Sequence, residues 1–314
     1  RGLLALDIDR DRDMDLLVLH AEPPHELFLN DRLWDYRRGE GFGSLLETPL
    51  LAILGADLDA DGWPELIGAG GDGRLKHWRR DPEAGWVVSD LGALSRPGSD
   101  WAQLALLDAD GDGSLELLDA GSGGWTLRDR TGRQLAADAA PLAGLSPLVT
   151  DPRRGPGLLT LAPDGRLALH PPGAGRFDYL TLSLSGKEDQ AQSMRSNASG
   201  LGAGVALRVG SRWTLQDYLR PLSGPGQGLQ PLAFGLGGAE RADFVAIDWS
   251  DGVFQSELDL AAGKHLLVGA VVQRRAVVVD AMPHGVQPVT ITDNHVQQCR
   301  QLIYPVAKQV AQSS

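Results

Sequence analysis

Cysteine is nearly absent from this 314-residue sequence: Cys299 is the single one, so an intrachain disulfide is excluded. Covalent haem is excluded as well, because no Cys-x-x-Cys-His motif occurs. No apolar run reaches the roughly 18 residues that cross a bilayer, and the longest candidate, near residues 266–279, is interrupted by Gln273 and two arginines. We therefore expect a chain that does not span a membrane.

Basic residues are also few. Lysine and arginine total 29 against 41 aspartates and glutamates, which gives a formal net charge of −12. Such a balance argues against nucleic acid and anionic lipid surfaces as direct partners. The chain begins at Arg1 rather than methionine and shows no signal peptide, so we expect a processed or truncated chain with further repeats upstream.

Recognisable catalytic patterns are missing too. The seven histidines form no His-x-x-x-His pair, and no Gly-x-Ser-x-Gly elbow is present. The glycine-rich stretches lack the Lys-Ser/Thr that completes a phosphate-binding loop. We therefore expect a non-enzymatic protein.

Glycine and acidic residues, in contrast, are abundant. Forty glycines and 19 prolines favour many short strands joined by turns, and a 42% hydrophobic content is enough for real cores. Three acidic stretches begin at Asp7, Asp57 and Asp108, at steps of 50 and 51 residues. Each carries carboxylates at positions 1, 3, 5 and 9 and is followed by an apolar, strand-like run.

This spacing predicts three cation loops. Calcium takes roughly six to eight oxygen ligands, and alternating carboxylates on a tight loop converge on one point. Position 7 would contribute a backbone carbonyl, and Gly62 and Gly113 stand where the chain turns sharply. The alternative is a solvated acidic turn. We predict about three calcium ions, with these ligands: Asp7, Asp9, Asp11, Asp13 and Asp15; Asp57, Asp59, Asp61, Trp63 and Glu65; Asp108, Asp110, Asp112, Ser114 and Glu116.

The repeat length predicts the fold class. Four short strands in a unit of about 50 residues are typical of a β-propeller blade. We predict an all-β protein whose residues 1–172 form about four blades of a larger propeller. Three blades carry intact cation loops, and a fourth, degenerate copy keeps only Asp151.

A second unit follows a Pro- and Gly-rich linker at residues 171–175. Alternating strands separated by glycine-rich turns predict a β-sandwich-like domain over residues 176–270. Residues 271–314 form a C-terminal extension. Within it, apolar residues at helical spacing predict a helix at residues 294–312, which either packs on its own domain or docks on a partner. The apolar face comprises Val296, Cys299, Ile303, Val306 and Val310.

Several motifs carry a family resemblance. The acidic loops, with the segment at residues 27–30, resemble the FG-GAP or VCBS repeats of integrin-α-like propellers. Residues 196–203 (Ser-Asn-Ala-Ser-Gly-Leu-Gly-Ala), 234–237 (Phe-Gly-Leu-Gly) and 247–252 (Ile-Asp-Trp-Ser-Asp-Gly) are similar to motifs of the ASPIC/UnbV domain. Ser250 stands where proline is usual. The pairing of the two units resembles cartilage-acidic-protein-like proteins and covers about residues 1–270.

The resemblance implies calcium binding, a role in adhesion or binding, and an extracellular, cell-surface or periplasmic location. It implies no established reaction. We therefore predict a calcium-binding scaffold or adhesion protein that binds a protein or an extracellular glycan, and that joins a larger assembly through its C-terminal segment. The alternative is a calcium-dependent extracellular hydrolase or lyase acting on glycans or lipids.

Overall fold

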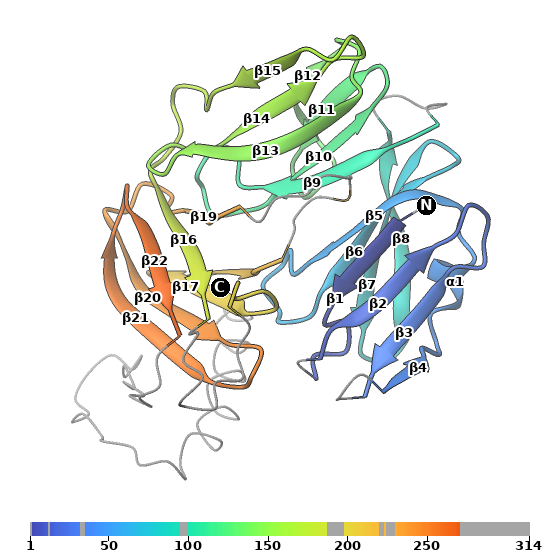
Figure 1. The fold of residues 1–314 in the computed structure, drawn as a ribbon, viewed down its shortest axis with the longest axis horizontal. Coiled ribbons are helices and arrows are strands. Elements are labelled where there is room, and N and C mark those ends of the chain that lie inside the picture. Colours follow the sequence, from blue (N-terminus) through green and yellow to red (C-terminus); the bar gives the residue numbers. More distant parts are fainter. Residues whose placement is uncertain are drawn as a thin grey trace.

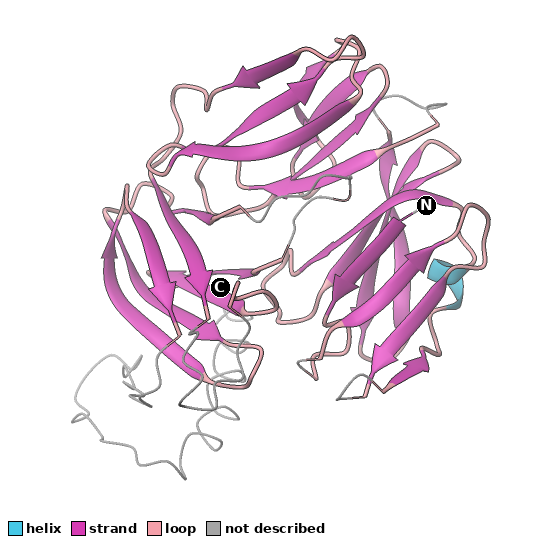
Figure 2. Cartoon of the chain, in the orientation of Figure 1, coloured by secondary structure: helices cyan, strands magenta, loops and turns pink. Residues whose placement is uncertain are grey.

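The computed structural model describes residues 2–11, 13–31, 35–94, 100–186, 198–219, 223 and 230–270. Strands account for almost all of the regular structure there, and the one helix is the short α1 (Gly43–Leu46) (Figure 2). None of the helical structure within those ranges is long and apolar enough to cross a membrane. The all-β prediction is confirmed.

The first two repeats form four-stranded antiparallel sheets in which the strands follow one another in sequence order. We call each of these sheets a blade. Blade one contains β1 (Gly2–Leu6), β2 (Asp15–Leu19), β3 (Glu26–Asn30) and β4 (Tyr36–Arg38), and blade two contains β5 (Leu50–Ala56), β6 (Glu65–Gly70), β7 (Arg74–Asp81) and β8 (Gly85–Ala93).

Blade three repeats this arrangement, whereas blade four has three strands in the part that the structure describes. The sequence predicted the strand that follows each acidic loop, but not the first and last strands of blade one or the last strand of blade three. Blade three contains β9 (Gln103–Leu107), β10 (Glu116–Gly121), β11 (Gly124–Arg128) and β12 (Gln134–Asp138), and blade four contains β13 (Gly144–Asp151), β14 (Gly155–Leu161) and β15 (Leu167–His170).

The first strands of neighbouring blades pack against each other in the order β1, β5, β9, β13, and the blades form an open arc (Figure 1). Burial along the second strands reflects this arrangement. All residues of β6 and β10 are buried, because blades two and three have a neighbour on both faces. Burial along β2 alternates, and blade two is the one neighbouring blade that the described residues place against blade one. Adjacent Leu117 and Leu118 accordingly belong to the cores on opposite sides of blade three.

Residues 176–270, within the described ranges, form a second β-rich unit, which we call the second domain. Its two sheets share one apolar core that includes Leu182, Phe234, Val245 and the fully buried Trp249. The sheets have the strand orders β19-β16-β22 and β18-β17-β20-β21. The strands are β16 (Tyr179–Ser185), β17 (Gly204–Val209), β18 (Arg212–Asp217), β19 (Leu232–Gly235), β20 (Arg241–Asp248), β21 (Phe254–Ala261) and β22 (His265–Gly269).

Sequence patterns predicted four of these seven strands and did not indicate β18, β19 or β22. The strand β19 holds the first half of the Phe-Gly-Leu-Gly motif, where glycine weakens a strand signal. The C-terminal extension at residues 271–314, including the predicted helix at residues 294–312, lies outside the described residues. The docking role of that helix therefore stays a prediction.

Candidate metal centres

Each acidic loop connects the first and second strands of its blade. The position-1 aspartates follow directly after β1, β5 and β9, and the position-9 carboxylates are the first residues of β2, β6 and β10. The three loops therefore occupy the same place in three successive blades. We call them loop one, loop two and loop three.

One hydrogen bond recurs in all three loops. The position-9 carboxylate accepts the backbone N–H of position 2, which ties the loop back onto the start of the second strand. The donor–acceptor pairs are Ile8 N–H to Asp15 (2.9 Å), Leu58 N–H to Glu65 (2.6 Å) and Ala109 N–H to Glu116 (2.6 Å). The sequence predicted position 9 as a ligand but gave no sign of this second role.

The turns are also shared. Position 4 is left-handed in every loop, with φ of 63° at Arg10, 60° at Ala60 and 82° at Gly111. Position 6 is left-handed in loops two and three, as the glycines predicted, and the Gly62 and Gly113 N–H groups donate to the position-1 aspartates at 2.8 and 2.9 Å. Non-glycine residues pay a steric cost for such backbone angles. The hydrogen bonds of the motif therefore hold the loop in a backbone conformation that Arg10 and Ala60 would not favour by themselves.

Carboxylate oxygens converge in each loop. One oxygen from each member of a trio lies within 4.8 Å of the other two, a spacing that suits a shared cation. The trios are Asp7, Asp9 and Asp15; Asp57, Asp59 and Asp61; and Asp108, Asp110 and Glu116.

The remaining predicted ligands lie outside these trios. Asp11, Asp13, Glu65 and Asp112 contribute no oxygen to them. Trp63 and Ser114 were predicted to act through their backbone oxygens, and in the structure their N–H groups donate to Asp61 and Asp112, both at position 5.

Burial makes these carboxylates costly to ionise when no cation is bound. Desolvation, reinforced by neighbouring carboxylates, raises the pKa of Asp57 and Asp108 to about 7 and the pKa of Glu65 and Glu116 to about 8. Desolvation likewise raises the pKa of Asp15 to about 6. A bound divalent cation would favour the ionised forms and offset the repulsion.

Asp57 gives the sharpest indication of a ligand. The residue is only 5% exposed, and its Oδ2 accepts the Gly62 N–H. Its Oδ1 is buried and has no hydrogen-bond partner among the described residues. Buried polar atoms are normally paired, so an orphaned carboxylate oxygen beside Asp59 and Asp61 calls for a positively charged partner. The donor set, all oxygens, fits a hard cation such as calcium.

Loop three is enclosed by the second domain. Gly235 N–H donates to Asp108 Oδ2 at 2.9 Å, and Gly237 N–H donates to the Gly111 carbonyl at 2.8 Å. Three further donors reach carbonyls of the loop. They are the hydroxyl of Tyr179 to Asp108 (3.0 Å), the N–H of Phe177 to Asp110 (2.9 Å) and the hydroxyl of Thr214 to Gly113 (2.9 Å).

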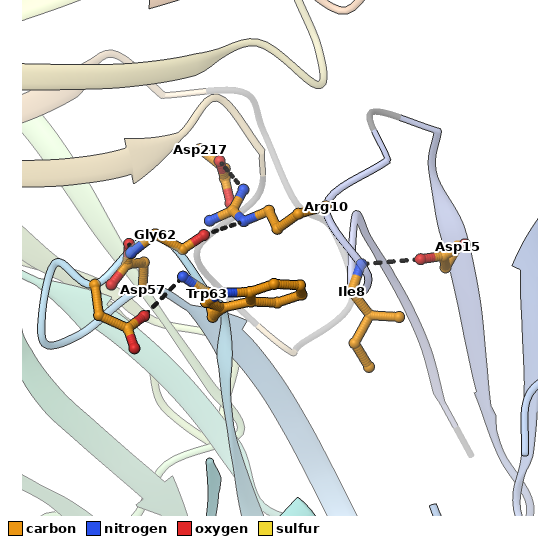
Figure 3. A network of polar contacts seen from close by, with 8 residues as sticks. Ile8, Arg10, Asp15, Asp57, Gly62, Trp63 and Asp217 are labelled. Atoms are coloured by element: carbon orange, nitrogen blue, oxygen red, sulfur yellow. Dashed lines mark hydrogen bonds and ion pairs between the residues drawn. The ribbon is translucent and has the colours of Figure 1, made fainter. Parts of the chain in front are cut away.

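Arg10 links loops one and two to the second domain. Its guanidinium donates to the Gly62 carbonyl at 2.6 Å and to Asp217 Oδ1 at 3.3 Å (Figure 3). Asp217, Asp57 and Asp7 all act on this guanidinium and, against its desolvation, raise its pKa. Arg10 is therefore a resident positive charge between two acidic loops.

Sequence reasoning missed these contacts with the second domain. Arg10 was visible as a basic residue at position 4 of an acidic loop, and Phe-Gly-Leu-Gly was visible as a motif. Neither signal showed that the motif and the loops meet, because 124 residues separate Gly111 from Gly235. Asp217 and Thr214 carried no signal at all.

Two family descriptions match parts of the chain. Residues 57–118 match "FG-GAP-like repeat", and residues 193–275 match "ASPIC and UnbV". The chain thus pairs an FG-GAP-like repeat region with an ASPIC and UnbV domain, as the motifs predicted. The narrower likeness to cartilage-acidic-protein-like proteins stays a prediction.

No curated protein matches the chain. One similar solved structure is the V. cholerae biofilm matrix protein Bap1, with 13% sequence identity and a TM-score of 0.31. The likeness covers 81% of this chain and 58% of that one. At that similarity it carries no argument about function.

Proposed function

We propose that this protein is a non-enzymatic, calcium-binding scaffold or adhesion protein that works outside the cytoplasm. The observation that carries the proposal is the buried, unpartnered Oδ1 of Asp57 within an acidic loop whose architecture recurs in three blades. Calcium suits the loops because it accepts six to eight oxygens in flexible geometry, whereas magnesium demands a near-ideal octahedron.

The family matches support the scaffold role and the location. The pairing of FG-GAP-like repeats with an ASPIC and UnbV domain resembles the architecture of extracytoplasmic binding proteins. The resemblance implies no established reaction. Cavities between neighbouring blades, such as that beside His77 and Leu117, have volumes of about 10 to 20 Å³. That is room for about one water molecule, so these cavities favour packing over small-molecule chemistry.

Calorimetric titration of the full chain with calcium tests the proposal. We expect about three ions to bind, and Asp57→Asn to remove or weaken one of them while the other two remain. Glu83→Gln is the matched control, because Glu83 is an exposed acidic residue outside the loops. Absence of calcium binding by the wild-type chain would contradict the proposal.

Two further measurements test the location and the non-enzymatic assignment. Protease accessibility of the chain in intact cells tests the extracytoplasmic location. Calcium-dependent turnover in a panel of polysaccharide and ester substrates would replace the non-enzymatic assignment with the hydrolase or lyase alternative.

A further inference from the structure

The Phe-Gly-Leu-Gly motif lies directly against loop three. A Cβ built on Gly235 would lie 2.2 Å from the carbonyl carbon of Gly111 and 2.3 Å from Asp108 Oδ2. Only glycine allows so close an approach of two backbones. The motif therefore forms a fitted contact with the acidic loop, in addition to its place in the core of the second domain.

The second domain fixes the backbone of loop three at successive points. Its donors bond to the carbonyls of positions 1, 3, 4 and 6, and Gly235 bonds to the position-1 carboxylate. These contacts hold the loop in the form in which Asp108, Asp110 and Glu116 converge. In the absence of a cation those three carboxylates repel one another when they are ionised, and opening the loop would break the same bonds.

Loops one and two also lie at the boundary between the blades and the second domain. Arg10 bridges Gly62 and Asp217, and Met14 lies close to Gly202 of the second domain. Asp57, with its orphaned oxygen, stands in the loop that Arg10 contacts. Loops one and three therefore contact the second domain directly, and loop two is linked to it through Arg10.

We propose that cation binding in loop three and docking of the second domain through Phe-Gly-Leu-Gly favour each other, so that calcium controls how tightly the second domain is held. The inference rests on the proposed calcium binding. Docking pre-organises the ligands and lowers the entropic cost of binding the ion. By linkage, the ion must then strengthen docking by the same factor, typically 5- to 150-fold.

Hydrogen exchange of the full chain measures docking directly. The Phe177, Gly235 and Gly237 amides donate to loop three, so peptides covering residues 174–179 and 232–238 report on the contact. We expect calcium to slow their exchange by about 5- to 150-fold. Residues 254–261, on the far edge of the other sheet, serve as the internal reference.

A matched pair of substitutions separates loop three from loop two. Asp110 and Asp59 are both exposed position-3 aspartates that accept the N–H of position 5. Asp110→Asn should abolish the calcium effect on residues 232–238, whereas Asp59→Asn should leave it intact. Equal loss in both variants would overturn the role assigned to loop three.

The reciprocal experiment removes hydrogen-bond donors from the second domain and measures the affinity of the chain for calcium. Tyr179→Phe with Thr214→Val deletes two hydroxyl donors while nearly preserving side-chain shape, and should weaken one of the three sites by at least several-fold. Gly235→Ala should do so more strongly, with Gly269→Ala as the control, because a Cβ at Gly269 meets nothing within 4 Å.

The outcomes separate the two proposals. Calcium binding with unchanged protection at residues 232–238, and with unchanged affinity in the donor variants, would overturn the coupling alone. Failure of the wild-type chain to bind calcium would overturn the proposed function, and the coupling with it.

Discussion

Blades three and four join their first two strands in different ways, although both connections contact Tyr179. Blade three uses the nine-residue acidic loop from Asp108 to Glu116, and the Tyr179 hydroxyl donates to it. Blade four uses a tight turn from Asp151 to Gly155, and the Tyr179 N–H donates to the Arg153 carbonyl.

The charges of the two connections are opposite. In blade four, Arg153 forms an ion pair with Asp178, and Arg154 donates to the carbonyls of Pro172 and Gly173. Guanidinium groups of the chain thus supply positive charge where loop three, on our proposal, recruits an ion. On that proposal, blades one to three depend on a bound cation and blade four does not.

Cation removal should have the largest effect and should separate the two blades. Each site that binds calcium only in the folded state contributes about 2.7 kcal/mol at 100 times its Kd. We expect EDTA to lower the melting temperature clearly and to speed amide exchange in β9 and β10 more than in β13 and β14. A melting temperature unmoved by EDTA, or equal deprotection of blades three and four, would contradict a cation requirement confined to blades one to three.

The stability of the protein should also depend on pH through the buried carboxylates of loop three. The pKa of Asp108 is raised to about 7 and that of Glu116 to about 8, above their unfolded values near 4. The folded, cation-free protein therefore binds more protons than the unfolded chain between about pH 4 and 8, so its stability falls as pH rises through that window. Calcium requires the ionised forms, so its stabilising effect should grow over the same window.

Melting temperatures measured from pH 5 to 9, with calcium and with EDTA, check this sign. The difference between the two should widen up to about pH 8 and then level off. Asp108→Asn with Glu116→Gln should flatten the trend in EDTA, because it removes two of the groups that titrate. A difference that stays constant across the range would contradict the assignment of these carboxylates as ligands.

The blades could be predicted from the sequence because their signals are local. The acidic pattern repeats at 50 and 51 residues, and each copy is followed by an apolar strand such as β2 or β10. Edge strands gave weaker signals, since β12 is exposed along nearly its whole length and needs no apolar pattern. The convergence of each carboxylate trio also follows from local spacing.

The contacts between loops and second domain could not be predicted in this way. The hydrogen bond from Gly235 to Asp108 spans 127 residues, and that from Arg10 to Asp217 spans 207. Backbone N–H groups and glycines carry no residue-type signal for a partner so distant. Local patterns thus identified the acidic loops and the Phe-Gly-Leu-Gly motif, and only the tertiary structure brought them together.

Gln103 ties blade three to blade four, so its loss should have an intermediate effect. Its buried side chain donates to the Leu145 carbonyl and accepts the Leu145 N–H at 3.1 Å. Gln103→Ala would leave both backbone groups unsatisfied at a cost of about 1–3 kcal/mol each. Urea unfolding should show this loss with and without calcium, and Gln134→Ala, at an exposed position of β12, should show none.

Arg153→Ala should have the smallest effect, although it removes a positive charge of the chain itself from blade four. Arg153 is 67% exposed and Asp178 40%, so solvent and salt screen the pair. Exposed ion pairs contribute about 0–1 kcal/mol, and we expect a loss within that range that shrinks further as salt is added. Urea unfolding at low and high ionic strength measures it. A loss above about 2 kcal/mol, insensitive to salt, would show that the guanidinium carries as much stability at its blade as calcium does at the others.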